Sequence, residues 1–305
     1  MKINHNNYLK LAFENAKINL GKTKMNPSVG CVIVKNDSVI SSGRTSTSGR
    51  PHAEANALKN KKNFNNSDLY VTMEPCTHYG VTPPCTNLIS KKGIKRVFFS
   101  SNDFDSRTAK LAKNKLKEKN IKAYKIIQKK FSSFYQSYFI NKKKLEPLID
   151  AKIAISKDYY TINKKSKWIT NVFSRRRAHL IRSEYDAIIS TSKSINSDNA
   201  ELNCRLGGFN KNKPDLFIID MNLKLKRGLK IFRNNSKRKI FLITSEKNKN
   251  KKEYLKKRGI KIINIKRLID KNDFKELFQI IKKHGYNRLL VESGLVFLNT
   301  LFKYR

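Results

Sequence analysis

The chain alternates between short apolar runs and longer stretches in which apolar residues recur at helical spacing. Residues 7–20 have this spacing and are followed by Gly21, which predicts a helix and its end. The continuous apolar run at 29–34 predicts a buried strand, and the turn at 36–37 predicts a hairpin with a second strand at 39–40. Further strands are predicted at 69–73, 95–100 and 121–127, and further helices at 53–58, 86–92, 110–119 and 131–142. This alternation predicts an α/β layered domain built around one sheet.

A polar segment at 142–147 interrupts this pattern. We place a domain boundary after residue 145, which gives domains of 1–145 and 146–305. The second half again predicts an α/β domain, with helices at 173–182 and 274–284 and strands at 148–155, 187–190, 216–220, 239–244, 261–265 and 288–292. It contains no Gly-x-Gly-x-x-Gly segment, so the dinucleotide fingerprint of a Rossmann domain is absent.

The composition is strongly basic, with 66 Lys and Arg against 23 Asp and Glu and a formal net charge of +43. Such a charge favours binding to nucleic acid or another anionic surface. The excess is mostly Lys, spread along the chain and accompanied by many Asn and Ile residues, which share A/T-rich codons. We therefore attribute the charge to a composition bias. A nucleic-acid-binding deaminase is kept as a minor alternative.

The apolar pattern also bears on the compartment. No stretch resembles a signal peptide or approaches the length of a membrane span, so no membrane partner is expected. The chain has four cysteines, and they do not form a disulfide framework. Cys31 lies in an apolar run and is predicted to be a core residue, whereas Cys204 is placed in a polar loop. A cytoplasmic protein is predicted.

Two short segments carry metal-ligand chemistry. Pro51-His52-Ala53-Glu54 supplies one imidazole, and the segment from Met73 to Cys85 supplies the thiols of Cys76 and Cys85. One His and two Cys provide three zinc ligands and leave the fourth tetrahedral position open for water, as catalytic zinc requires. His-x-Glu combined with Pro-Cys and a second Cys is typical of zinc deaminases, although their usual spacing is Pro-Cys-x-x-Cys.

Glu54 is the predicted catalytic residue. Zinc lowers the pKa of its water from about 15.7 toward about 7, and a carboxylate two residues beyond His52 can pass the proton to a departing amine. Pro51 is expected in the first turn of a helix. Cys76 is expected to open a turn or helix and Cys85 to precede a helix, and helix N-termini favour thiolates.

The eight residues between the cysteines, Thr77 to Pro84, indicate which family of zinc deaminases the chain resembles. They resemble the deaminase half of the bifunctional riboflavin-biosynthesis deaminase–reductases, and Asn26-Pro27-Ser28-Val29-Gly30 is similar to that family's substrate-side motif. The resemblance implies a cytidine-deaminase-like α/β/α domain that removes an amino group from a phosphoribosylamino-pyrimidine. It also implies that Asn26 and His78 contact the pyrimidine, although a satisfied loop histidine is an equal alternative for His78.

The second half resembles the reductase half of the same family through its segments at 152–158, 166–170, 194–205 and 291–294. The resemblance implies a dihydrofolate-reductase-like α/β fold that reduces ribosyl to ribityl with NADPH. It places NADPH against Ala154, Trp168, Ser194, Asp198, Ser293 and Gly294. It places the phosphoribosyl substrate against Ser166, Leu202, Arg205 and Glu292.

The resemblance also implies several dozen further residues after position 305, which close the reductase sheet and contribute to a homodimer. We therefore expect a C-terminally truncated reductase domain with an unpaired sheet edge. The expected function is zinc-dependent deamination followed by NADPH-dependent reduction of a small phosphoribosyl-pyrimidine. The alternative is a deaminase joined to a non-catalytic reductase-like remnant.

Overall fold

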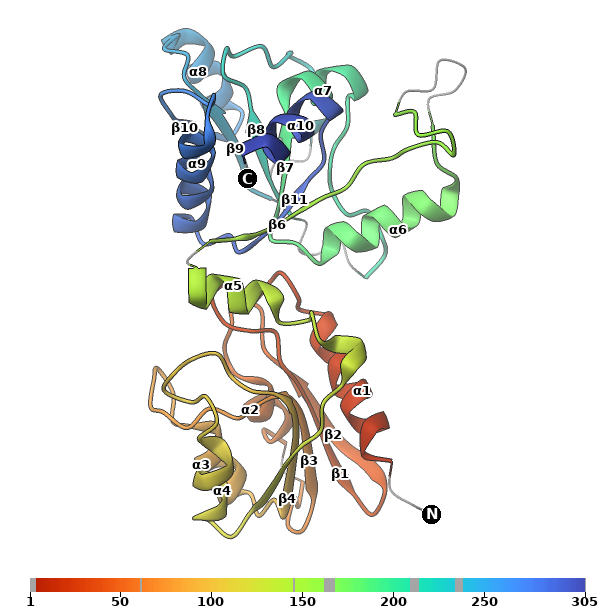
Figure 1. Ribbon diagram of the computed structural model, residues 1–305, viewed down its shortest axis with the longest axis vertical. Coiled ribbons are helices and arrows are strands. Elements are labelled where there is room, and N and C mark those ends of the chain that lie inside the picture. Colours follow the sequence, from red (N-terminus) through yellow and green to blue (C-terminus); the bar gives the residue numbers. More distant parts are fainter. Residues whose placement is uncertain are drawn as a thin grey trace. The chain divides into compact units, whose positions relative to one another are not determined.

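The computed structural model describes residues 4–60, 62–144, 146–161, 168–208, 214–233 and 238–304. It divides into two compact units, Met1–Leu145 and Glu146–Arg305 (Figure 1). Each unit is an α/β structure with its own sheet, as the hydrophobic pattern predicts. No helix in the described part of the chain is long and apolar enough to cross a bilayer.

The first unit is built on a five-stranded sheet with the order β2-β1-β3-β4-β5. Its strands are β1 (Gly30–Lys35), β2 (Ser38–Arg44), β3 (Asp68–Met73), β4 (Arg96–Ser101) and β5 (Lys122–Lys125). Strand β1 runs antiparallel to both β2 and β3, whereas β3, β4 and β5 are parallel. The predicted hairpin at 36–37 is therefore confirmed.

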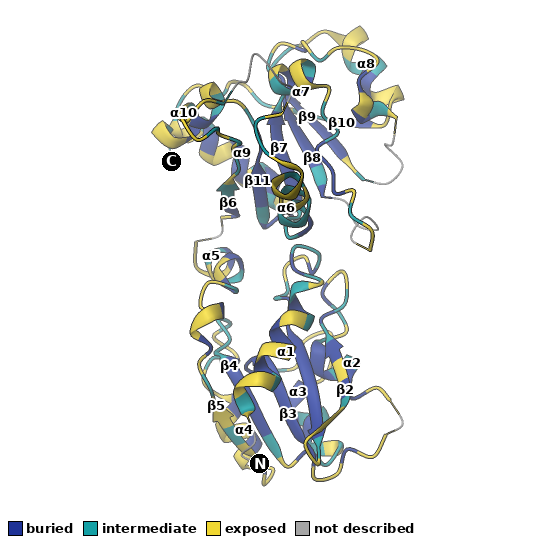
Figure 2. Cartoon of the chain, turned by 90° about the vertical axis from the view of Figure 1, so that its right-hand side faces the viewer, coloured by how far each residue is buried: buried dark blue, intermediate teal, exposed yellow. Residues whose placement is uncertain are grey.

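Helices cover both faces of this sheet (Figure 2). They are α1 (His5–Lys17), α2 (Ala53–Ala57), α3 (Cys85–Lys91), α4 (Ala112–Lys117) and α5 (Gln136–Lys144), with a 3₁₀ turn η1 (Lys129–Phe131) before α5. Leu9 and Ala12 of α1 pack on Val32 and Tyr70 of one sheet face. Side chains of α2, α3 and α4 join the opposite face, because successive strand residues point to opposite sides.

The second unit is built on a six-stranded parallel sheet with the order β10-β9-β8-β7-β11-β6. Its strands are β6 (Leu148–Ala151), β7 (Ala187–Thr191), β8 (Asp215–Ile219), β9 (Ile240–Thr244), β10 (Ile260–Asn264) and β11 (Arg288–Val291). Such sheets are buried on both faces, which explains their continuous apolar runs in the sequence. Strand β6 ends at Ala151 and is shorter than the predicted strand at 148–155.

Helices again cover both faces of this second sheet. They are α6 (Val172–Ser183), α7 (Ser192–Asp198), α8 (Lys249–Lys257), α9 (Lys271–Lys283) and α10 (Leu295–Tyr304), with a 3₁₀ turn η2 (Lys230–Phe232). Helices α9 and α10 contribute to the core on one face, and α7 and α8 to the core on the other. The sequence pattern did not predict α7 or α8, and Asp198, which the resemblance places against NADPH, is the last residue of α7.

Candidate active sites

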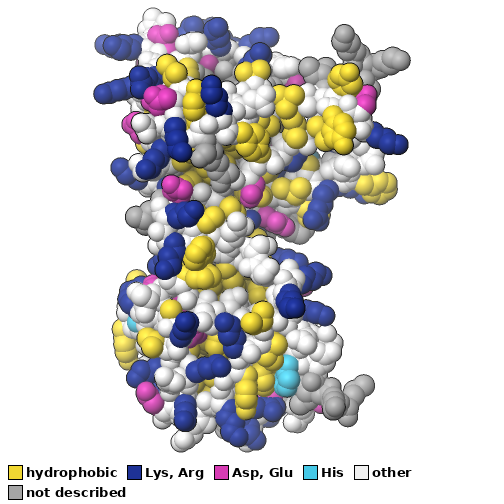
Figure 3. Space-filling model, viewed as in Figure 1, with side chains coloured by type: hydrophobic (Ala, Val, Ile, Leu, Met, Phe, Trp, Pro, Cys, Tyr) yellow, Lys and Arg dark blue, Asp and Glu magenta, His cyan; other side chains and the backbone are white. Residues whose placement is uncertain are grey.

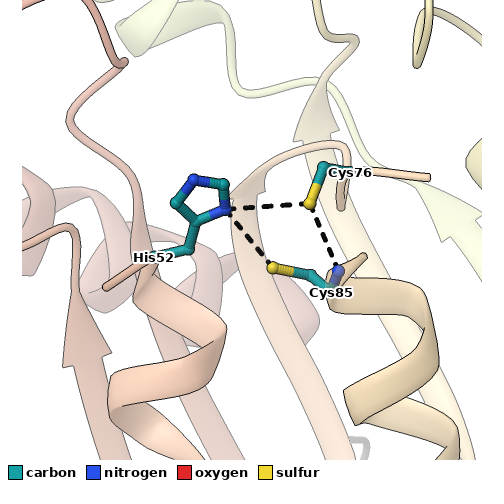
Figure 4. A group of neighbouring side chains, drawn as sticks. All are labelled: His52, Cys76 and Cys85. Atoms are coloured by element: carbon teal, nitrogen blue, oxygen red, sulfur yellow. Dashed lines mark hydrogen bonds between the residues drawn. The ribbon is translucent and has the colours of Figure 1, made fainter. Parts of the chain in front are cut away.

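The ends of secondary-structure elements position the three metal-ligand candidates of the first unit (Figure 4). His52 is the N-cap residue of α2, and Cys85 is the first residue of α3. Cys76 lies in the irregular segment that follows β3. Pro51 precedes the N-cap, so the expectation that it sits in the first helical turn is wrong. The three side chains nevertheless converge, as the motif predicts.

The distances within this group fit a zinc ion. His52 Nδ1 lies 3.7 Å from Cys76 Sγ and 3.4 Å from Cys85 Sγ, and all three ligand atoms lie within 4.8 Å of one another. A tetrahedron with zinc–ligand bonds of about 2.0–2.3 Å places neighbouring ligand atoms about 3.5–3.8 Å apart. One imidazole nitrogen and two sulfurs are also a donor set that zinc prefers.

Helix α3 stabilises the thiolate of Cys76. Its first backbone N–H, from Cys85, donates to Cys76 Sγ at 3.2 Å. Cys76 does not open a turn or helix itself, so this part of the prediction is wrong, but the helix N-terminus still serves its sulfur. Hydrogen bonding from the Cys85 side chain, together with His52, lowers the pKa of Cys76 to about 4. The same contact raises the pKa of Cys85, because its thiol acts as the donor.

Glu54 lies beside this group on α2 and is 4% exposed. Burial raises the pKa of its carboxyl to about 7, and the Cys76 thiolate adds to the effect while His52 opposes it. A carboxyl group with a pKa near neutral pH can both accept and donate a proton under working conditions. Its position and protonation behaviour therefore suit a general acid–base.

The two predicted pyrimidine contacts lie on loops of the same unit. Asn26 Nδ2 donates to the carbonyl of Gly49 at 2.9 Å. His78 Nδ1 is hydrogen-bonded to Thr108 Oγ1 at 2.9 Å, which leaves Nε2 for another partner. One hydrogen bond thus holds each side chain in place, through the amide nitrogen of Asn26 and the ring nitrogen Nδ1 of His78.

Glu74 is a residue of this region that sequence reasoning did not single out. It is 3% exposed and accepts backbone N–H groups of Asp103, Lys110 and Ala112 at 3.2, 3.0 and 3.0 Å. It thereby holds the loop that carries Thr108, the partner of His78. In the sequence, only its place next to Pro75-Cys76 marks Glu74 as a residue of the site. Its hydrogen bonds could not be predicted, because the three partners lie about 30 residues away or more.

In the second unit, a cluster of hydroxyls lies at the carboxyl ends of β7 and β11. Thr191 Oγ1 lies 3.1 Å from both Ser194 Oγ and Ser293 Oγ, and the N–H of Gly294 donates to Ser194 Oγ at 3.2 Å. Ligands of parallel α/β sheets bind at this edge, where helix N-termini favour phosphate groups. These donors fit a phosphorylated dinucleotide such as NADPH.

A charged network surrounds Glu292, which is 6% exposed. Arg182 donates to both carboxylate oxygens at 2.5 and 2.9 Å, and Lys152 Nζ lies 2.9 Å away. Burial raises the pKa of Glu292, but these two cations outweigh it, so the pKa lies below its ordinary value. Arg182, on α6, was missed because the neighbouring run at 175–177 is the more conspicuous basic feature of the sequence.

Asn203 connects this network to Arg205. Its carbonyl accepts from Arg182 Nη1 at 3.1 Å, and its Oδ1 accepts from Arg205 Nη1 at 2.8 Å. Arg205 Nη2 also lies 3.4 Å from His179 Nε2. Glu292 and Arg205, two of the residues predicted to hold the phosphoribosyl substrate, therefore belong to one polar assembly.

The remaining predicted residues are distributed as follows. Leu202 is buried, Asp198 is exposed at the end of α7, and Ala154 is half-buried in the segment after β6. Trp168 is 54% exposed, and the guanidinium carbon of Arg175 lies over its ring, 4.6 Å from the ring centre. Ser166 lies outside the described residues. Cys204 lies in the loop segment after α7, as predicted, and is fully buried there.

Two family models match the chain. "Cytidine and deoxycytidylate deaminase zinc-binding region" matches residues 2–101, and "RibD C-terminal domain" matches residues 147–305. The riboflavin biosynthesis protein RibD of Aquifex aeolicus is 33% identical over 97% of this chain and 83% of its own length. That of Actinobacillus pleuropneumoniae is 30% identical over 94% of this chain and 77% of its own length.

Solved structures agree with these relatives. The RibD of Acinetobacter baumannii superposes with a TM-score of 0.79 at 27% identity, over 98% of this chain and 83% of its own. The diaminohydroxyphosphoribosylaminopyrimidine deaminase/5-amino-6-(5-phosphoribosylamino)uracil reductase of Thermotoga maritima gives a TM-score of 0.78 at 25% identity, over 95% and 80%.

A zinc-dependent deaminase unit followed by an NADPH-dependent reductase unit defines a bifunctional enzyme of two α/β domains. The chain belongs to the RibD family of riboflavin biosynthesis. The expectations of a deaminase-like fold, a reductase fold and the cofactors zinc and NADPH are thereby confirmed.

Proposed function

We propose that residues 1–145 deaminate 2,5-diamino-6-(5-phosphoribosylamino)pyrimidin-4-one and that residues 146–305 reduce the ribosyl group of the deaminated product. The name of the Thermotoga maritima enzyme, which this chain resembles over 95% of its length, supports these two substrates. The division of the chain into Met1–Leu145 and Glu146–Arg305 supports the assignment of one reaction to each unit.

The deaminase reaction rests on the convergence of His52, Cys76 and Cys85 beside the buried Glu54. A zinc ion held by these three side chains would lower the pKa of water far enough for attack as hydroxide near neutral pH. Glu54 takes the proton from the attacking water and passes it to the departing amino group, which leaves as ammonia. Asn26 and His78 contact the pyrimidine ring, and their hydrogen bonds to Gly49 and Thr108 orient them for this role.

Replacement of Glu54 by Gln tests this mechanism. The amide has nearly the same shape but cannot take up the proton, so the variant is expected to bind zinc normally and to lose ammonia release by about 10²–10⁴-fold. Zinc is measured by metal analysis and ammonia by a coupled assay. Glu14→Gln, on the exposed part of α1, is the matched control and should behave as the wild type. An active Glu54→Gln enzyme would remove Glu54 from its role.

In the reductase reaction, NADPH would lie against Ala154, Trp168, Ser194, Asp198, Ser293 and Gly294, and it supplies the hydride that converts ribosyl to ribityl. The hydroxyl cluster at the ends of β7 and β11 supports this position. Ser166, Leu202, Arg205 and Glu292 would hold the phosphoribosyl substrate. Arg205 can bind phosphate through two parallel N–H groups. Glu292 orients the side chains of Lys152 and Arg182 through its ion pairs with them.

The reductase half is tested with the deaminated intermediate as substrate. Oxidation of NADPH, followed by its absorbance, is expected only when that intermediate is present. Ser194→Val should weaken NADPH binding without changing ammonia release, because Ser194 lies in the other unit from the zinc ligands. If the intermediate is never reduced although NADPH binds, the second half is a non-catalytic remnant.

Two finer proposals concern partners and location. We infer a homodimer that acts on small phosphorylated pyrimidines in the cytoplasm and does not use nucleic acid as a substrate. The four cysteines are free and support a reducing compartment. Light scattering of the purified protein tests the dimer, and RNA binding with a steep salt dependence would contradict the choice of substrate class.

A further inference from the structure

Arg50 joins the two chain segments that carry the metal ligands. It precedes Pro51-His52, and its Nη1 donates to Thr82 Oγ1 at 2.8 Å. Thr82 belongs to the segment between Cys76 and Cys85. The guanidinium is therefore fixed next to the candidate zinc site.

The guanidinium of Arg50 and the ring of His78 lie on the same side of Gly80. A Cβ built on Gly80 would lie 3.6 Å from Arg50 Nη2 and 4.0 Å from His78 Nε2, the nearest heavy atoms of the described residues apart from its two chain neighbours. The second amino group of Arg50 thus points into the same space as the free nitrogen of His78. A ligand that contacts His78 comes within reach of Arg50.

Arg50 also differs from two of the other three arginines of the first unit, Arg96 and Arg107. Arg96 and Arg107 form ion pairs with Asp68 and Asp105, and Arg44 donates to Asn15 Oδ1. No carboxylate pairs with Arg50 among the described residues. The segment 77–84 contains no Lys or Arg of its own, so Arg50 is the cation that this segment contacts through Thr82.

We propose that Arg50 binds the phosphate of the phosphoribosyl substrate in the deaminase site and sets its preference for phosphorylated over dephosphorylated pyrimidines. The proposal rests on the proposed function, which gives the substrate its phosphate. A guanidinium offers five N–H donors in a planar fork that matches phosphate oxygens. Thr82 occupies one donor and thereby orients the remaining ones.

A competing role for Arg50 is purely structural, since its hydrogen bond to Thr82 links two loops. The two roles predict different kinetics. A structural link affects every substrate equally, whereas a phosphate ligand affects only substrates that carry the phosphate. Thr82→Val separates them further, because it breaks the link and keeps the cation.

The experiment compares ammonia release by the zinc-loaded full chain from the phosphorylated substrate and from its dephosphorylated ribosyl analogue. Arg50→Gln should raise the KM for the phosphorylated substrate about 10- to 100-fold, as expected for the loss of a charge-assisted hydrogen bond. Its kcat and its KM for the analogue should stay within about twofold of the wild type. Arg50→Lys should recover part of the preference, and Thr82→Val, which keeps the cation but loses the hydrogen bond that orients it, should keep most of it. Lys91→Gln, at the far end of α3, is the control for charge alone.

The failures of the two proposals can be distinguished. A wild-type protein that binds zinc and releases no ammonia from either substrate would overturn the proposed function, and the assignment of Arg50 would fall with it. An active wild type whose preference for phosphate survives Arg50→Gln would overturn the assignment of Arg50 alone. The same conclusion follows if Arg50→Gln impairs both substrates equally.

Discussion

Opposite electrostatic effects act on neighbouring groups at the zinc site. Cys76 receives hydrogen bonds from Cys85, so the charged form of its thiol is favoured and its pKa is low. Glu54 lies within the same buried volume, and there desolvation outweighs the hydrogen bonds that its carboxylate accepts from its own backbone N–H and the Cys85 thiol, so its charged form is disfavoured and its pKa rises to about 7. The first group is thereby suited to bind a metal as an anion, and the second is suited to exchange protons near neutral pH.

The raised pKa of Glu54 predicts a pH dependence of stability for the zinc-free protein. Its folded pKa of about 7 lies above the ordinary value of 4.5. The carboxyl group therefore contributes stability that is fully present below about pH 4.5 and is lost as the pH rises through about 7. Urea unfolding of zinc-free wild type and of Glu54→Gln should show the wild type losing free energy of unfolding relative to the variant between pH 5 and pH 8. A constant difference over this range would contradict the raised pKa.

At the scale of elements, the sequence predicts what depends on local periodicity. Most strands of both sheets follow from apolar runs, and the helix that begins at Ala53, with His52 as its N-cap, follows from its pattern of small apolar residues. Helix α7 escaped prediction because Ser192–Asp198 has one fully buried apolar residue, Ile195, and no amphipathic stripe. In α8, Leu255 is the buried anchor among lysines, which makes the segment resemble a solvated loop.

The motif indicated the convergence of His52, Cys76 and Cys85 for a different reason. Cysteine, histidine and glutamate at this spacing have few structural uses, so the residue types alone indicate the chemistry. The contacts of Glu74, Arg50 and Arg182 could not be predicted in this way. Each joins residues about 30 or more positions apart, and only the folded chain brings such partners together.

The ion pairs of Glu292 predict a large effect for one residue of α6. Arg182→Met removes the bidentate partner and leaves the buried carboxylate with Lys152 alone. Removing one partner of a buried ion pair costs about 3–5 kcal/mol of unfolding free energy. Urea unfolding of the second unit measures this cost. Arg176→Met, on an exposed position of the same helix, should change the free energy by less than about 0.5 kcal/mol. Similar values for the two variants would mean that the network does not stabilise the fold.

At the scale of the whole molecule, the charge is distributed and the hydrophobic cores are separate. Lys and Arg side chains are scattered over the face in Figure 3 and do not gather into one patch. On this face, the distribution agrees with a bias of composition more than with a nucleic-acid-binding surface. Each unit buries its own apolar clusters, Leu9 and Phe13 belonging to those of the first and Phe217 and Leu242 to those of the second.

Separate cores and separate cofactors predict two transitions on heating. A ligand that binds only the folded form stabilises the unit that holds it, by about 2.7 kcal/mol at a concentration 100 times its Kd. Removal of zinc by a chelator should therefore lower the Tm of the first unit alone, and added NADPH should raise the Tm of the second unit alone. Scanning calorimetry of the full chain measures both effects.

Variants assign each transition to a unit. Cys76→Ser, which removes a predicted zinc ligand, should abolish the response to the chelator, and Ser194→Val should reduce the response to NADPH. A single transition that shifts with either ligand would show that the two units unfold together, and the division after residue 145 would not describe independent domains.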